Sequence, residues 1–170
     1  MTAPAAAGAP FPYPAGAAPY PAGAADRTGH AAPADRTSLP DRGRSSSAVL
    51  RLVNDGRTQA GCRPVREHPA LTRAAQRQSA HMARTETLTH SGPGGRRPGG
   101  RLAAAGYRWS RVGEDLAQGQ PDAATVVREW MRSPGHRRTL LTCAYEHAGV
   151  GVTGGGREGP WWTVLLASRR

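Results

Sequence analysis

The chain has 170 residues and a formal net charge of +11, and all 23 of its basic side chains are arginine. This length allows one folded domain and a tail. Because no run of about 18 apolar residues occurs, we expect no transmembrane helix. Residues 1–47 hold four arginines against three aspartates, so nearly all of the net charge belongs to the rest of the chain.

Two explanations of the arginine excess stay open. Selection for an anionic partner is one, and a GC-rich genome, which enriches arginine, alanine, glycine and proline together, is the other. The arginines are scattered rather than gathered in a stripe with aromatic residues, which argues against nucleic acid as the partner. Any contact with a polyanion is expected on the folded part of the chain.

Residues 1–47 are predicted to form a disordered or extended tail or linker, and the domain is predicted to span 48–170. The tail contains the direct repeat PYPAGAA at 12–18 and again at 19–25. Proline at this density is incompatible with helix and sheet, and aliphatic side chains are too scarce for a core. No charged segment followed by an apolar segment begins at Met1, so a secreted form would need an upstream start or another export route.

Apolar residues at helical spacing predict helices over 47–61, 69–84, 98–106 and 122–133. Ser47 and Asp122 are expected to cap the first and last of them, and Gly61 to end the first. Ser133 followed by Pro134 indicates that a new short helix starts there.

Strands are predicted after the last helix. Ala148, Val150 and Val152 alternate with glycines, three glycines form a turn, and residues 161–167 return as an apolar strand. Helices followed by a meander indicate an α+β fold with helices packed on a small antiparallel sheet. The letters Gly-x-Gly-x-x-Gly at 149–154 do not predict a dinucleotide site, because a turn and a strand follow them instead of a helix.

The two cysteines, Cys62 and Cys143, bracket most of the predicted domain. One disulfide between them would close a loop of about 80 residues and stabilise the fold by about 4.5 kcal/mol in the chain-entropy model. Such a bond implies an oxidising compartment. Two buried free thiols in a cytosolic protein are the alternative.

Candidate site residues are dispersed along the chain: His90 at the end of a loop, Glu114 in a Val-Gly-Glu-Asp segment, and His136 in the first turn of the restarted helix. The positive end of a helix lowers the pKa of an imidazole, so His136 is expected to stay neutral. Two imidazoles and a carboxylate can hold a divalent metal, or act as base and orienting group without one. A surface or bracing role is the plainer alternative for each.

The chain resembles the bacterial members of the CAP superfamily, the SCP-like extracellular group of cysteine-rich secretory, antigen 5 and pathogenesis-related proteins. The resemblance covers residues 48–167. Its segments are VLRLVN at 49–54, GCRP at 61–64, LTRAAQ at 71–76, HMA at 81–83, THS at 89–91, RLAAAGY at 101–107, VGED at 112–115 and WMRSPGHR at 130–137.

This resemblance implies an α-β-α sandwich with a central cleft. Carried over by motif, the cleft residues are His90, Glu114 and His136, and they are the candidate ligands of zinc or another divalent metal. Ser133 stands where eukaryotic members have a second glutamate, for which Glu129 is a possible substitute.

Two further departures concern the same region. Asp115 replaces the usual asparagine after the glutamate, and Thr139 stands where bacterial relatives often have asparagine. These changes bear on metal affinity and catalysis more than on the fold.

Three functional hypotheses follow. The first is a secreted or envelope-associated monomer whose cleft binds an extracellular lipid, glycan or anionic polymer. The second is a protease-like hydrolase that uses Glu114 with His90 and His136, with or without metal. In the third, the histidines only hydrogen-bond Glu114 and brace the fold. Resemblance defines site geometry better than reaction, so we favour the first.

Overall fold

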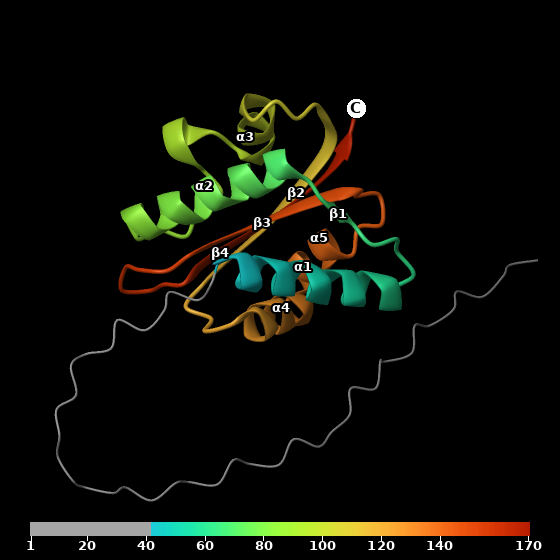
Figure 1. The fold of residues 1–170 in the computed structure, drawn as a ribbon, viewed down its shortest axis with the longest axis horizontal. Coiled ribbons are helices and arrows are strands. Elements are labelled where there is room, and N and C mark those ends of the chain that lie inside the picture. The colour runs from blue at the N-terminus through green and yellow to red at the C-terminus, as the bar shows by residue number, and fades with distance from the viewer. Residues whose placement is uncertain (1–41) are drawn as a thin grey trace, which may run out of the picture. The chain divides into compact units, whose positions relative to one another are not determined.

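The structure, a computed structural model, describes residues 42–170, which form helices on both faces of one sheet (Figure 1). The predictions for residues 1–41 lie outside the described residues. The elements are α1 (Arg42–Gln59), β1 (Arg66–Glu67), α2 (Pro69–Thr85), a 3₁₀ turn (Pro93–Gly95), α3 (Pro98–Ala104), β2 (Trp109–Gln118), α4 (Ala123–Arg132), α5 (Pro134–Leu140), β3 (His147–Thr153) and β4 (Trp161–Arg169).

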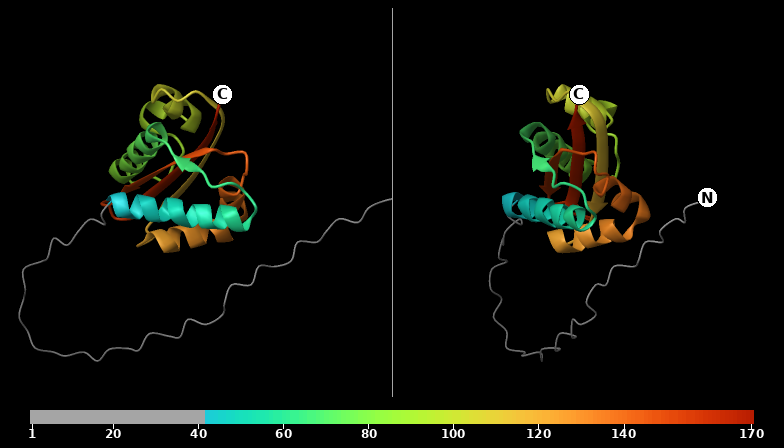
Figure 2. Two further views of the ribbon diagram at one scale, coloured as in Figure 1. Left: turned by 45° about the vertical axis from the view of Figure 1, so that its right-hand side comes forward. Right: turned by 90° about the vertical axis from the view of Figure 1, so that its right-hand side faces the viewer.

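The sheet has the strand order β1-β3-β4-β2. β3 and β4 pair antiparallel, as do β4 and β2, whereas the two-residue β1 lies parallel to β3. The predicted α+β fold is therefore confirmed, with a mixed rather than purely antiparallel sheet. Figures 1 and 2 show α2 and α3 on one side of the sheet and α1 and α4 on the other, which makes the three layers of an α-β-α sandwich.

The alternation along β3 and β4 divides the core between these layers. One face carries Val150, Val152, Trp162 and Val164 and packs against the buried valines of α1 and α4. The opposite face presents Leu165 to α2 and α3. Both faces are buried because helices cover each of them, so β4 is buried along nearly its whole length.

Gly149 and Gly151 let α2 lie directly on the sheet. A Cβ at Gly149 would be 2.2 Å from the backbone of Leu71, and one at Gly151 would be 2.4 Å from the backbone of Ala75. Side chains at these positions would push the helix away, so glycine is required for close approach. The Gly-x-Gly pattern thus serves helix–sheet packing, in agreement with the rejection of a dinucleotide site.

Several predicted boundaries hold and others do not. α2 and α3 appear where the periodicity predicted them, and Asp122 caps α4 by accepting from Thr125 N–H at 2.7 Å. The predicted cap Ser47 lies inside α1, which begins at Arg42. No proline occurs between 41 and 63, so nothing interrupts the helix there. Strand β2 was not predicted at all.

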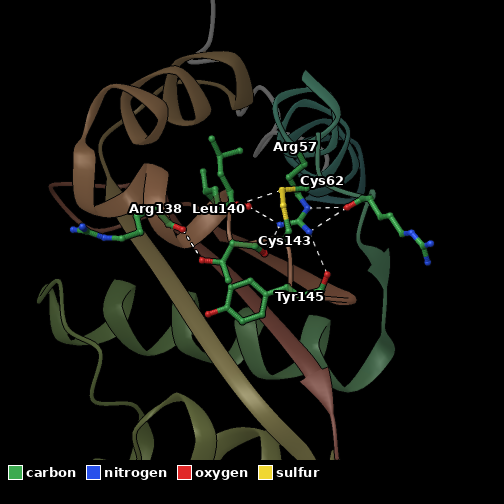
Figure 3. Close-up of a disulfide and its surroundings, with 9 residues drawn as sticks. Arg57, Cys62, Arg138, Leu140, Cys143 and Tyr145 are labelled. Atoms are coloured by element: carbon green, nitrogen blue, oxygen red, sulfur yellow. Dashed lines mark hydrogen bonds between the residues drawn. A yellow bond between two sulfur atoms is a disulfide. The ribbon is translucent and has the colours of Figure 1, made fainter. Parts of the chain in front are cut away.

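The disulfide Cys62–Cys143 joins the end of α1 to the segment before β3, with Cα atoms 4.8 Å apart, and confirms the predicted pairing. The guanidinium of Arg57 lies buried beside it (Figure 3). It donates only to backbone carbonyl oxygens, those of Arg63, Leu140, Thr142 and Tyr145, at 2.7–3.2 Å. Burial lowers the pKa of Arg57. This side chain and the disulfide together tie α1 to the α5–β3 connection.

Within residues 42–170, no helix combines the length and the apolar character needed to cross a bilayer.

Candidate functional site

Strand β2 is the edge strand that carries the candidate acid. Glu114 pairs with Leu165 of β4 and Asp115 pairs with Val164, so the two carboxylates point to opposite faces of the sheet. Glu114 faces the α2–α3 layer, and Asp115 faces α5. Both are buried, which places two acidic groups on the two sides of one strand.

The carboxylate of Glu114 is held from two directions. His90 Nδ1 lies 2.8 Å from its Oε1, and the guanidinium of Arg101 donates to its Oε2. The side chains of Glu114 and Arg101 are only 1% and 5% exposed, whereas that of His90 is 52% exposed. The His90–Glu114–Arg101 cluster therefore has a buried ion pair at its base and a half-exposed imidazole at its mouth.

Sequence reasoning missed Arg101, although the RLAAAGY segment contains it. Its guanidinium also donates to the carbonyl oxygens of His90 and Arg96, each at 2.8 Å. Arg101 therefore holds the backbone that carries His90 in place. In the sequence it is one arginine among 23, and only its position on the buried side of α3 distinguishes it.

The two histidines are shifted in opposite directions. The hydrogen bond that His90 donates to the carboxylate of Glu114 raises the pKa of His90 above its ordinary value. Burial lowers the pKa of His136, and the charge of His90 lowers it further. The expectation that His136 stays neutral is thus supported, with burial rather than the helix end as the cause. These opposite shifts favour the charged form of His90 and the neutral form of His136.

Asp115 is a second titratable group behind the site. Burial raises its pKa to about 7, and a hydrogen bond with Thr139 only partly opposes this shift. Its Oδ2 is buried and has no hydrogen-bond partner in the part of the chain that the structure describes. A buried carboxyl group without a cation of its own is costly to ionise, which accounts for the direction of the shift.

The structure brings His90 and Glu114 into contact but leaves His136 apart. Among the described residues, no hydrogen bond or ion pair joins His136 to either of them, although His90 is near enough to shift its pKa. Glu129, the possible substitute ligand, is exposed and accepts from Gln120 at 2.7 Å.

These donors do not fit a metal ion as they stand. No group of three or more His, Cys, Asp or Glu side chains within residues 42–170 is arranged to hold one. Both oxygens of Glu114 are already engaged, one of them by a guanidinium. Metal binding therefore stays a prediction. A calorimetric titration with zinc of the wild type and of His90→Ala tests it.

A cavity of about 390 Å³ opens beside the His90–Glu114–Arg101 cluster. His90 and Glu114 line it together with Arg97, Gly99 and Trp109. The charged or titratable groups at its wall are thus the imidazole of His90, whose pKa is raised, the guanidinium of Arg97, and the carboxylate of Glu114, which is already engaged by His90 and Arg101. The cavity suits a ligand that carries negative charge.

Comparison with known proteins identifies the family. Residues 50–166 match the model of the CAP, or cysteine-rich secretory protein, family. The chain belongs to this family. Over 115 residues, 68% of the chain, the CAP domain is 30% identical to the protein YkwD of Bacillus subtilis (strain 168). That match spans 44% of YkwD, so the chain covers less than half of this relative.

Solved CAP-type structures resemble this domain in fold. An extracellular protein of Bacillus anthracis that contains an SCP domain superposes with a TM-score of 0.70 at 21% identity, over 84% of this chain and 45% of that one. An outer surface protein of Borrelia burgdorferi superposes with a TM-score of 0.67 at 19% identity, over 73% and 92%. At these identities the likeness supports the fold alone, and it confirms the α-β-α sandwich.

Proposed function

We propose that this CAP domain is an extracellular binding domain that holds an anionic ligand in the cavity beside His90. One observation carries the proposal. His90 is half exposed at the mouth of the cluster, its pKa is raised by Glu114, and Arg97 lines the same cavity. A carboxylate or phosphate entering there meets two cations in partly desolvated surroundings.

The extracellular location is supported by two observations. The disulfide between Cys62 and Cys143 is typical of proteins from oxidising compartments. Two proteins of the same fold are described as an extracellular protein and an outer surface protein.

Glu114 serves this function as a positioning residue rather than as a ligand. Its two oxygens are already engaged by His90 and Arg101 and its side chain is 1% exposed, so it presents little surface to an incoming group. Instead, it orients the imidazole and keeps it protonated.

The test is a calorimetric titration of the full chain at low salt with digalacturonate and, separately, with phosphatidylglycerol vesicles. At pH 5.5 we expect at least one of these probes to bind. His90→Ala is expected to weaken binding about tenfold, the loss of about 1.4 kcal/mol of charge-assisted contact. His81→Ala, on the surface of α2, is the matched control and leaves affinity unchanged.

The pH dependence has a definite sign. Since the pKa of His90 is raised, its charge is present at pH 5.5 and is lost as the pH rises through that raised value. Binding by the wild type is therefore weaker at pH 8.5, whereas His90→Ala shows a smaller change, which comes from the ionisation of Asp115 near pH 7. The proposal is wrong if neither probe binds, or if His90→Ala binds as tightly as the wild type.

A protease-like hydrolase is the second candidate, and one observation favours it. His90 and His136 have pKa values shifted apart, as in an acid and base pair. In this reading neutral His136 accepts a proton and charged His90 donates one. The wild type should then turn over peptide or ester libraries, and the His90→Ala/His136→Ala double variant should not. A wild-type domain that is inert toward both libraries excludes this candidate.

A further inference from the structure

Trp109 is an exposed aromatic ring held in a defined position. The other three tryptophans of the chain are buried, whereas Trp109 is 37% exposed. Its indole N–H donates to the carbonyl oxygen of Gly99 at 2.9 Å, and a Cβ at Gly99 would lie 2.4 Å from the ring. The ring therefore packs directly on the backbone of α3 and presents its remaining surface to solvent as a rigid platform.

An irregularity in the pairing of edge strand β2 lies at Trp109. Pairing between β2 and β4 shifts register between Trp109 and Arg111, so one extra residue is inserted in β2 there. Such irregularities re-aim side chains at strand ends. Figure 2 shows α3 close to the ends of β2 and β4, where Trp109 begins its strand.

Trp109 is the wall that two cavities share. One is the cavity of about 390 Å³ that His90 and Arg97 also line, and the other is a cavity of about 640 Å³ that Arg108 and Arg170 also line. The N–H of Arg170 donates to the carbonyl oxygen of Arg108 at 3.1 Å, which holds these two backbones together.

Each of the two cavities that Trp109 lines thus has arginine side chains in its lining. Among the residues that the structure describes, no carboxylate forms an ion pair with Arg97, Arg108 or Arg170. Their charge is available to a ligand.

We propose that the two cavities form one groove for an acidic polysaccharide, with a sugar ring stacked on Trp109 and the anionic groups of neighbouring sugars bound by the arginines on either side. This inference rests on the proposed function, which it extends from the His90 cavity across Trp109. A pyranose has an apolar ring face that matches an indole, and its charged substituents recur along the chain.

Single-stranded nucleic acid fits this surface less well. Such ligands stack successive bases on several aromatic side chains. The only large apolar side chains exposed in residues 42–170 are Trp109 and Leu88, so the groove offers a single stacking platform. One ring between cations suits one sugar between charged neighbours.

The test compares hexagalacturonate with digalacturonate, using tryptophan fluorescence of the full chain at low salt. The three buried tryptophans are inaccessible, so a ligand-induced emission shift and protection from acrylamide quenching report on Trp109. We expect the hexamer to bind at least about tenfold more tightly than the dimer, because it reaches the second set of cations. Neutral maltohexaose, which has six glucose units, should not bind.

The variant series separates this inference from the proposed function. Arg108→Ala/Arg170→Ala should weaken hexamer binding about tenfold and leave dimer binding unchanged within about twofold. Both side chains are exposed, so the fold is not at risk. Arg128→Ala/Arg132→Ala, which removes two exposed arginines of α4, controls for the loss of two charges. Trp109→Phe should lose the emission response and weaken hexamer binding, with circular dichroism checking the fold.

Three outcomes overturn the groove. They are equal affinity for dimer and hexamer, no change in the Trp109 emission on saturation, or tighter binding of a twelve-residue oligothymidylate than of the hexamer. If any one of these outcomes occurs while digalacturonate binding still depends on His90, the groove is refuted and the proposed function is not. If His90→Ala has no effect on the dimer, the proposed function itself fails.

Discussion

Asp115→Asn is expected to make this domain more stable at alkaline pH. The carboxyl group of Asp115 is buried, one of its oxygens has no partner among the described residues, and its pKa is raised from 3.8 to about 7. Between these two values the folded state holds a proton that the unfolded state has released. The free energy of unfolding therefore falls as the pH rises through this window, by about 1.4 kcal/mol per pH unit.

Over the whole window this loss amounts to about 4 kcal/mol, an order-of-magnitude figure. Total stabilities of domains are about 5–15 kcal/mol, so the effect is large enough to measure. Asparagine cannot ionise, and its amide keeps a hydrogen-bonding group toward Thr139. The variant should thus exceed the wild type by several kcal/mol at pH 8.5, with the advantage shrinking as the pH falls from about 7 to 4.

Urea unfolding followed by the emission of the buried tryptophans measures this difference at intervals from pH 4 to 8.5. Asp55→Asn is the matched control, because it makes the same chemical change on the exposed face of α1. Its difference from the wild type should stay within about 0.5 kcal/mol at every pH. Parallel curves for the wild type and Asp115→Asn would refute the reasoning, because they would mean that ionising Asp115 costs the folded state nothing.

Three further changes test the frame around the site. Gly149→Ala should destabilise the domain by about 1–3 kcal/mol or more, because its Cβ would meet the backbone of α2. Gly135→Ala in α5 is the control: its Cβ would meet no atom within 4 Å, so a thermal melt should show a neutral or slightly stabilising effect. Reducing the disulfide should cost about 4.5 kcal/mol for its separation of 81 residues, and an unchanged urea midpoint in dithiothreitol would contradict this. Glu114→Ala should cost about 3–5 kcal/mol, since it leaves a buried guanidinium uncompensated, and calorimetric melts that match the wild type would argue against bracing.

The parts of the fold that the sequence predicted are those set by local pattern. Alternation with glycine marked β3, and a capping aspartate marked the start of α4. Strand β2 was not predicted from the sequence, because Gly113, Glu114 and Asp115 at its centre are residue types depleted in strands. Both acids are buried there because helices cover the edge strand on each face, and no local pattern reports that coverage.

The buried arginines were unpredictable for a related reason. The buried guanidinium of Arg57 donates hydrogen bonds to carbonyl oxygens from three separate segments. That of Arg101 donates to the carboxylate of Glu114 on β2 and to two carbonyl oxygens of the loop before α3. These acceptors are assembled only in the folded chain. In a sequence with 23 arginines, nothing local separates these two from the solvated ones.

In the His90–Glu114–Arg101 cluster, the residues that support the fold differ from the residue proposed to bind a ligand. The sequence alone left these two roles as competing explanations. Arg101 and Glu114 form a buried pair whose loss leaves an unpaired charge, so they support the loop and the strand. His90 is half exposed, so replacing it removes a charge at the cavity mouth without opening the core. A single site can therefore perform both roles with different residues. Replacing Glu114 should lower both stability and affinity, because Glu114 also keeps His90 protonated, whereas replacing His90 should lower affinity alone. A His90→Ala variant that lost as much stability as Glu114→Ala would show that the two roles are not separable.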